Sequence, residues 1–217
     1  MDQKLLFLIN RQWTDPLLDR LMALLSSFPA WIPFMVVLIA LLFWRGGFHA
    51  RAFVLCAGLI VGINDGVISK GLKHLVSRPR PHQSIDGVRQ VDLGKATPRI
   101  LAIARPLKIK LSEAAPDLEG IDGRSFPSSH TVNTISVALL TACFYRRRGW
   151  LAFLPALAVS YSRIYTGSHW PSDVLASIFL GLGATLLLLC ALEWLWQKWG
   201  GRVTPALHVS HPSLLHS

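Results

Sequence analysis

The stretch SRIYTGSHWPSDVLASIFLGLGATLLLLCAL, residues 162–192, joins a polar cluster to a long apolar run. The run Val174–Leu192 has no charged residue and has the ~18–20 residues that a helix needs to cross a bilayer. The polar part just before it holds Arg163, His169 and Asp173. The stretch therefore predicts a membrane helix with a reactive cluster at one end.

Four further segments share this apolar character. The chain has 217 residues, of which 52% are hydrophobic and only 16% charged, well below the ordinary charged share of about 25%. The apolar segments, including the first, are Leu21–Trp44, Arg51–Lys73, Phe126–Tyr145, Gly149–Ser162 and Val174–Leu192. They predict an all-α, polytopic membrane helix bundle.

The N-terminal region leaves the number of spans open. Lys4–Phe28 is apolar in patches but carries charged residues, so it is either a sixth, irregular span or an interfacial pair of helices. We therefore expect five to six transmembrane helices. The region lacks the order of a cleaved signal peptide.

The whole chain, 1–217, is expected to form one integral membrane domain. Residues 1–20 are expected to be an N-terminal interfacial segment, and residues 201–217 a frayed surface tail. The polar stretch 77–125 is predicted to be one long extracytoplasmic active-site loop, because its prolines oppose a continuous helix.

The net charge of +10 indicates an anionic partner. Nucleic acid is excluded, because the basic residues flank apolar spans rather than line one soluble face. Anionic lipid headgroups fit better. The cysteines Cys56, Cys143 and Cys190 are isolated within apolar segments, which favours buried or lipid-facing roles over a disulfide or a metal site.

Orientation follows from the short basic loops. Threading the spans up and down places the polar motifs on one membrane face. The opposite face receives Arg45, Arg51, Arg146, Arg147, Arg148, Lys198 and Arg202. Because short basic loops favour the cytoplasm, the motif face is predicted to face the periplasm or outside of a bacterial cytoplasmic (inner) membrane. The loop 77–125 is also basic, which opposes this assignment.

The element Ser162-Arg163-x5-His169-x3-Asp173 has the residues for attack on phosphorus. A neutral imidazole is a nucleophile, and a carboxylate that accepts its other N–H fixes the tautomer. Four-residue spacing places two side chains on one helical face, so Asp173 is expected to orient His169. Gly167 and Pro171 are expected to turn the chain between two helices. Taken alone, His169 fits a helix cap equally well.

A second element, Pro127-Ser128-Ser129-His130, opens an apolar run. The N-terminus of a helix offers free amides and a positive dipole end to anions. Ser128 and the amide of Ser129 are therefore candidate phosphate ligands, and His130 is a candidate proton donor. An ordinary N-cap role for the serines is compatible with this.

A third element, Lys73-x6-Arg80-Pro81, supplies positive charge. Arg80 can bind two phosphate oxygens at once, whereas Lys73 acts as a point charge. Taken alone, a basic helix end facing lipid headgroups is the simpler interpretation. We expect the neighbouring Arg78 and His74 to be solvated or to face headgroups.

The three elements together resemble the motifs of the type 2 phosphatidic acid phosphatase family, in its membrane-bound branch. That family carries Lys-x6-Arg-Pro, then Pro-Ser-Gly-His, then Ser-Arg-x5-His-x3-Asp. All three occur here in order over about Lys73–Leu192, with Ser129 in place of the glycine. Serine retains the backbone amide, so phosphate binding is expected to survive.

The resemblance implies a metal-independent phosphatase without a cofactor. His169 would form a phosphohistidine, Asp173 would orient it, and His130 would protonate the leaving oxygen. The phosphate-binding residues would be Lys73, Arg80, Ser128, Ser129 and Arg163. Expected substrates are undecaprenyl diphosphate, phosphatidylglycerol phosphate, phosphatidate or lipid A 1-phosphate, with no nucleic acid or protein partner.

Two other functions fit the same residues. Vanadate-binding haloperoxidases share the motif set, but they are soluble, which the apolar runs oppose. A non-catalytic lipid-phosphate binder or transporter would use the same basic pocket, and it would release no phosphate.

Overall fold

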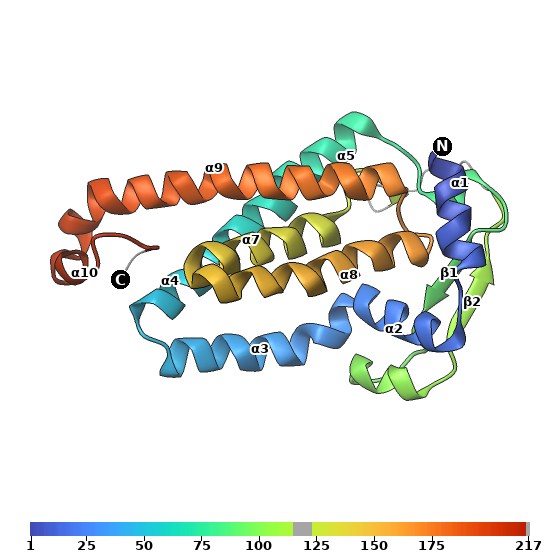
Figure 1. Cartoon of the computed structure of the whole chain (residues 1–217), viewed down its shortest axis with the longest axis horizontal. Helices are drawn as coiled ribbons and strands as arrows, with labels where there is room; N and C mark the ends of the chain where they lie inside the picture. Colours follow the sequence, from blue (N-terminus) through green and yellow to red (C-terminus); the bar gives the residue numbers. More distant parts are fainter. Residues whose placement is uncertain (115–122, 216–217) are drawn as a thin grey trace.

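The computed structural model describes residues 1–114 and 123–215 of the chain. Figure 1 shows long helices running side by side, with a small β-hairpin at the end where α1 lies. The elements are α1 (Asp2–Phe7), η1 (Leu8–Gln12), α2 (Pro16–Ser26), α3 (Phe28–Arg45), α4 (Phe48–Ile63), η2 (Asn64–Ser69), α5 (Lys70–Val76), α6 (Pro81–Ser84), β1 (Arg89–Asp92), η3 (Arg99–Ala104), β2 (Lys108–Leu111), α7 (Ser129–Gly149), η5 (Trp150–Ala152), α8 (Phe153–Tyr165), α9 (Pro171–Val203) and α10 (Pro205–Ser210).

Helix α7 is the centre of the bundle and packs against α4, α8 and α9. Its buried face includes Val132, Ile135 and Leu140, all fully buried. Helix α9 approaches it closely at Gly181, where an added Cβ would lie 3.0 Å from the carbonyl oxygen of Val132. This close packing holds the N-terminal part of α7, which carries Ser129 and His130, against α9, whose first turn carries Asp173.

Three helical segments of the described chain are long and apolar enough to cross a membrane. They are Phe28–Arg45, Phe48–Val76 and Pro171–Val203. The expected all-α membrane bundle is therefore confirmed as a class. The expected count of five to six spans would also need α7 and α8, and it stays a prediction. Helix α8 has only 13 residues, and the last turn of α7 carries three arginines.

The predicted continuous span Leu21–Trp44 is wrong. Helix α2 ends at Ser26, and α3 begins at Phe28 after a break at Ser27. Pro29 lies in the first turn of α3, where its missing N–H costs nothing, whereas inside a helix it would remove a hydrogen bond. After the break, α2 lies beyond α3 at the end of the bundle where α1 and the β-hairpin lie (Figure 1).

The described parts of the predicted loop, 77–114 and 123–125, contain more order than expected. Strands β1 and β2 form an antiparallel pair, with Arg89 opposite Leu111 and Asp92 opposite Lys108. This two-stranded sheet is a departure from the all-α prediction. Residues 115–122 of the loop lie outside the described residues.

The tail was expected to fray, and this expectation is wrong for its described part. Helix α9 continues to Val203, and α10 turns the chain back along it. The indole N–H of Trp196 donates to the carbonyl oxygen of His211 at 2.9 Å. The ring of His211 stacks on the ring of Phe48, with the ring centroids 4.3 Å apart. Leu214 is buried against the same surface.

Candidate active site

The turn between α8 and α9 presents His169 at the motif end of the bundle. Helix α8 ends at Tyr165 and α9 begins at Pro171, so the predicted turn at Gly167 and Pro171 is confirmed. The amide of His169 donates to the carbonyl oxygen of Arg163 at 3.1 Å. The backbone thus fixes His169 relative to α8 before any side-chain contact is made.

Gly167 is the residue that permits this turn. Its φ is +70°, a left-handed conformation that costs other residues about 1 kcal/mol, and an added Cβ would lie 2.8 Å from the carbonyl oxygen of Arg89. We expect Gly167→Ala to lower the melting temperature in detergent and to destabilise the fold by about 1–3 kcal/mol. Gly183→Ala is the matched control, because no atom lies within 4 Å of its added Cβ. Equal melting temperatures for the two variants would contradict this prediction.

The tautomer of His169 is set by a backbone carbonyl. His169 is 2% exposed, and its Nδ1 lies 2.6 Å from the carbonyl oxygen of Ser125. A carbonyl only accepts, so Nδ1 carries the proton and Nε2 carries a lone pair. Burial, followed by the charges of Arg163 and Arg80, lowers the pKa of His169 well below its ordinary value. Both effects favour the neutral form of the ring, with its lone pair on Nε2.

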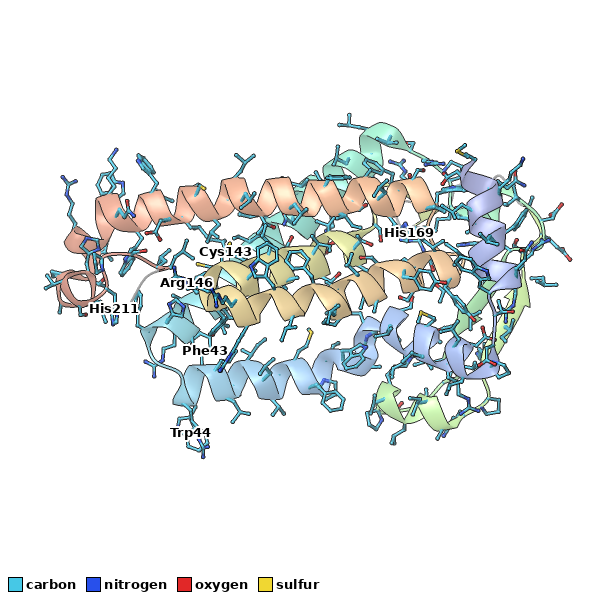
Figure 2. All side chains as sticks on the ribbon, in the orientation of Figure 1. Phe43, Trp44, Cys143, Arg146, His169 and His211 are labelled. Atoms are coloured by element: carbon cyan, nitrogen blue, oxygen red, sulfur yellow. The ribbon has the colours of Figure 1, made fainter. Side chains whose placement is uncertain are left out.

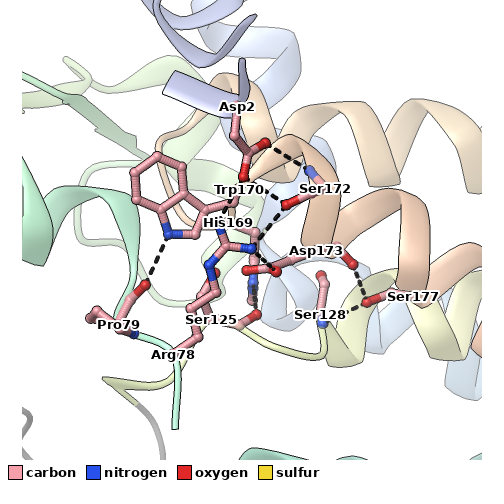
Figure 3. Close-up of polar contacts among 10 residues, drawn as sticks. All are labelled: Asp2, Arg78, Pro79, Ser125, Ser128, His169, Trp170, Ser172, Asp173 and Ser177. Carbon is pink, nitrogen blue, oxygen red and sulfur yellow. Dashed lines mark hydrogen bonds and ion pairs between the residues drawn. The ribbon is translucent and has the colours of Figure 1, made fainter. Parts of the chain in front are cut away.

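Asp173 does not take the place that its spacing predicted. Its Oδ1 accepts from Nη1 of Arg78 at 2.5 Å, while the partner of the His169 ring is the Ser125 carbonyl (Figure 3). The spacing rule applies within one helix, and His169 lies outside α9, which begins at Pro171. The expected hydrogen bond from His169 to Asp173 is therefore corrected, although both residues lie at one site.

Arg78 was expected to be solvated, and this is wrong. One arm of its guanidinium pairs with Asp173 and the other with Asp2, at 2.7 Å. The position of Arg78 two residues before Arg80 was the one signal in the sequence, because residues two apart can lie on the same side of an extended segment. The neighbouring His74 is exposed.

Polar groups of Ser128, in the second motif, already have hydrogen-bond partners within the protein. Ser128 is fully buried as the N-cap of α7, and its amide donates to Oγ of Ser177 at 2.9 Å. Oγ of Ser128 accepts from the hydroxyl of Thr131 at 3.1 Å. Ser129 and His130 form the first turn of α7, where backbone amides lack intrahelical partners.

His130 lies in a positively charged environment. The charges of Arg163, Arg80 and Lys73 all act on its ring. The edge of the ring meets Phe28 of α3, with ring centroids 6.3 Å apart. The structure thus brings residues of all three motifs together at one end of the bundle.

A polar cavity of about 330 Å³ lies at this end of the bundle, and its lining includes neither His130 nor His169. Arg80 and Arg163 line it, as do Ser26 and His82, which sequence reasoning missed. Nη1 of Arg163 donates to the carbonyl oxygen of Ser26 at 3.2 Å and also to its hydroxyl. The guanidinium is thereby fixed at the cavity wall. No motif marks Ser26, because α2 reaches the cavity only through the tertiary fold.

The fold and this cavity define a class, a helical integral membrane protein with a cationic, histidine-containing site. The chain belongs to the PAP2 superfamily, whose family model matches residues 51–197. Family membership, expected from the three motifs, is thereby confirmed. In the crystal structure of Aquifex aeolicus LpxE the same fold occurs, with a TM-score of 0.59, 22% identity, and coverage of 87% of this chain and 94% of that one.

Relatives differ in how much they share with this chain. Lipid A 4'-phosphatase of Porphyromonas gingivalis is 27% identical over 98% of this chain and 80% of its own length. Undecaprenyl-diphosphatase BcrC of Bacillus subtilis is 26% identical over 77% of this chain and 72% of its own length. The bacitracin transport permease protein BcrC of Bacillus licheniformis is 42% identical over 30% of this chain, which spans 32% of that protein.

Proposed function

We propose that this chain is a metal-independent phosphatase of lipid phosphates or diphosphates that works through a phosphohistidine intermediate. The observation that carries the proposal is the state of His169. Its buried ring is neutral, with Nδ1 bonded to the Ser125 carbonyl and the lone pair on Nε2. A nucleophile beside two guanidinium groups is what attack on a phosphate requires.

The reaction has two displacements. The lone pair on Nε2 of His169 attacks phosphorus, the bond from phosphorus to the lipid oxygen breaks, and His130 gives that oxygen a proton. In the second step water attacks the phosphohistidine, His130 takes a proton from the water, and the P–N bond breaks. His169 returns to its starting state and inorganic phosphate leaves.

The remaining predicted residues hold the phosphoryl oxygens. Arg80 and Arg163 line the cavity, Lys73 adds charge near His130, and Ser128 offers its hydroxyl. The Ser129 amide points from the first turn of α7, where anions bind. Asp173 contributes through Arg78 rather than by direct contact with His169.

The proposed substrates are anionic membrane lipids. They are undecaprenyl diphosphate, phosphatidylglycerol phosphate, phosphatidate and lipid A 1-phosphate. The names of two relatives, a lipid A 4'-phosphatase and an undecaprenyl-diphosphatase, fall in this range. The cavity supports a polar headgroup, since Gln90, Asp92, Thr166 and Ser168 complete its lining.

We further propose one membrane domain over 1–217, in a bacterial inner membrane with the cavity facing outward. The basic residues Arg45, Arg51 and Arg146–Arg148 lie at the ends of α3, α4 and α7 remote from His169, which supports this orientation. Residues 1–20 would then lie at the outer interface together with the loop 77–125.

The test is release of inorganic phosphate from each of the four lipids by the purified protein in detergent with EDTA. Release that resists EDTA and vanishes in His169→Ala supports the proposal. Release that EDTA abolishes contradicts metal independence. If no lipid releases phosphate but one is bound, the non-catalytic binder or transporter replaces the phosphatase.

The pH profile tests the charge environment of His169. Because its pKa is lowered by burial and by Arg163 and Arg80, the acid limb of kcat/KM is expected below the ordinary histidine value of about 6.5. Arg80→Met removes one positive charge, so the imidazolium becomes easier to form and the acid limb moves to higher pH. Profiles normalised to their maxima check this, and an unmoved limb would contradict it.

A further inference from the structure

Asp2 of α1 reaches the site from the other end of the sequence. Its Oδ1 accepts from the amide of Ser172 at 2.9 Å, and its Oδ2 accepts from the Ser172 hydroxyl at 2.6 Å. Oδ2 also pairs with Nη2 of Arg78 at 2.7 Å. Although burial opposes ionisation, the hydrogen bonds from Ser172 and Arg78 lower the pKa of Asp2. Asp2 is thus a carboxylate with a defined geometry rather than a free surface charge.

Arg78 is held on two sides by carboxylates. Nη1 bonds Asp173 of α9 and Nη2 bonds Asp2 of α1, and the guanidinium lies 5.1 Å from the ring centroid of Trp170. Nη1 also donates to the Ser172 hydroxyl at 2.9 Å, and the side chain is 34% exposed. Removing the charge of Asp2 would leave Nη2 without its carboxylate. The guanidinium would then be held by the Nη1 contacts to Asp173 and Ser172 and by the Trp170 ring.

The backbone of Arg78 connects it to the nucleophile. The amide of Ser125 donates to the carbonyl oxygen of Arg78 at 2.7 Å, and the carbonyl oxygen of Ser125 accepts from Nδ1 of His169 at 2.6 Å. The indole of Trp170, next to His169, donates to the carbonyl oxygen of Pro79 at 2.9 Å. Figure 3 shows these residues side by side. A shift of the Arg78 backbone that follows its side chain would therefore reach the carbonyl that aims the imidazole.

We propose that Asp2 is a positioning residue for His169, acting through Arg78 and Ser125. The proposal rests on the proposed function, since it assumes that His169 is the nucleophile. The described contacts of Asp2 are with Arg78 and Ser172. Its effect is on the aim of Nε2, and not on the binding of the phosphate.

A simpler account is that Asp2 only anchors α1. Exposed ion pairs contribute little to stability, about 0–1 kcal/mol, so loss of an anchor would leave both kcat and KM unchanged. A positioning role predicts a split, because misalignment of a reacting atom slows the chemical step without weakening binding. The two accounts therefore differ in kcat.

The experiment compares Asp2→Asn, Asp2→Glu and Asp15→Asn in the full chain. Asn at position 2 retains an acceptor for Ser172 but loses the charge that holds Arg78. Asp15→Asn makes the same change at the N-cap of α2, where asparagine caps as well as aspartate. Steady-state phosphate release and thermal unfolding in detergent are measured for each variant, beside the unmodified protein and His169→Ala.

We expect Asp2→Asn to lower kcat by about tenfold with KM within about twofold of the unmodified value. Asp2→Glu is expected to recover part of the loss, while Asp15→Asn matches the unmodified protein. The melting temperatures of the Asp2 and Asp15 variants are expected to equal that of the unmodified protein.

Several other outcomes would overturn the proposal. An unchanged kcat in Asp2→Asn overturns the proposal, as does an equal fall in Asp15→Asn or a fall that tracks a lower melting temperature. A rise in KM alone assigns Asp2 to binding and also overturns it. If the unmodified protein releases no phosphate, the proposed function fails first, and the positioning role fails with it.

Discussion

Replacing His169 with alanine is expected to lower kcat by at least about 10⁴-fold, because loss of the group that forms a covalent intermediate removes the reaction path itself. The remaining cations would still bind the substrate, so the Kd for the lipid is expected to change little. Phosphate release and equilibrium binding of the same lipid measure the two effects separately.

The control for this variant is His211→Ala. His169 and His211 lie at opposite ends of the bundle (Figure 2), and the hydrogen bond at His211 uses its backbone carbonyl, which alanine retains. Turnover within about twofold of the unmodified rate is expected there. A His169→Ala protein that melts normally and still turns over would remove the phosphohistidine mechanism.

The second large effect is expected at His130. His130→Gln removes proton transfer but keeps a polar side chain on the first turn of α7, so kcat for a lipid phosphate is expected to fall about 10²–10⁴-fold. The fall in the rate of the first step should be smaller with a nitrophenyl phosphate, because its leaving oxygen needs no proton from His130. Comparison of both substrates with the same variant checks this.

A slow second step gives an independent readout for the same variant. Without a base for water, the phosphohistidine should accumulate, and rapid quenching should recover acid-labile, base-stable phosphate on the protein. A uniform loss on both substrates with no trapped intermediate would assign His130 to phosphate binding instead of proton transfer.

Local sequence patterns predicted the parts of the site that one segment holds. Arg163 lies in the last turn of α8 and His169 lies in the turn that follows, whose Gly167 and Pro171 are both visible in the sequence. The apolar runs predicted the bundle, because a membrane helix needs one continuous stretch. Three motifs at helix ends then had to meet at one membrane face.

Contacts between distant segments could not be predicted in this way. Asp173 was assigned to His169 by helical spacing, but α9 begins only at Pro171, so the side chain turns to Arg78. Asp2 is an acidic residue in a short helix, and its partner Ser172 is far along the chain. Pro29 marks the break at Ser27 locally, but the packing of α2 against α8 that follows is a tertiary contact that no local pattern contains.

The break at Ser27 lies between a helix that is exposed to lipid, α3, and two contacts with residues of the site. Ser26, the last residue of α2, holds Arg163, and Phe28, the first residue of α3, meets the ring of His130. Only 6% of the α3 span is buried in the protein, so most of its surface faces surrounding acyl chains or detergent. The thickness of that surrounding layer is one influence on the tilt of α3, and the helix joins through one residue to contacts with both Arg163 and His130. We therefore expect the kinetic constants to depend on the lipid or detergent around the protein, so that values from different micelles or bilayers are compared only within one medium.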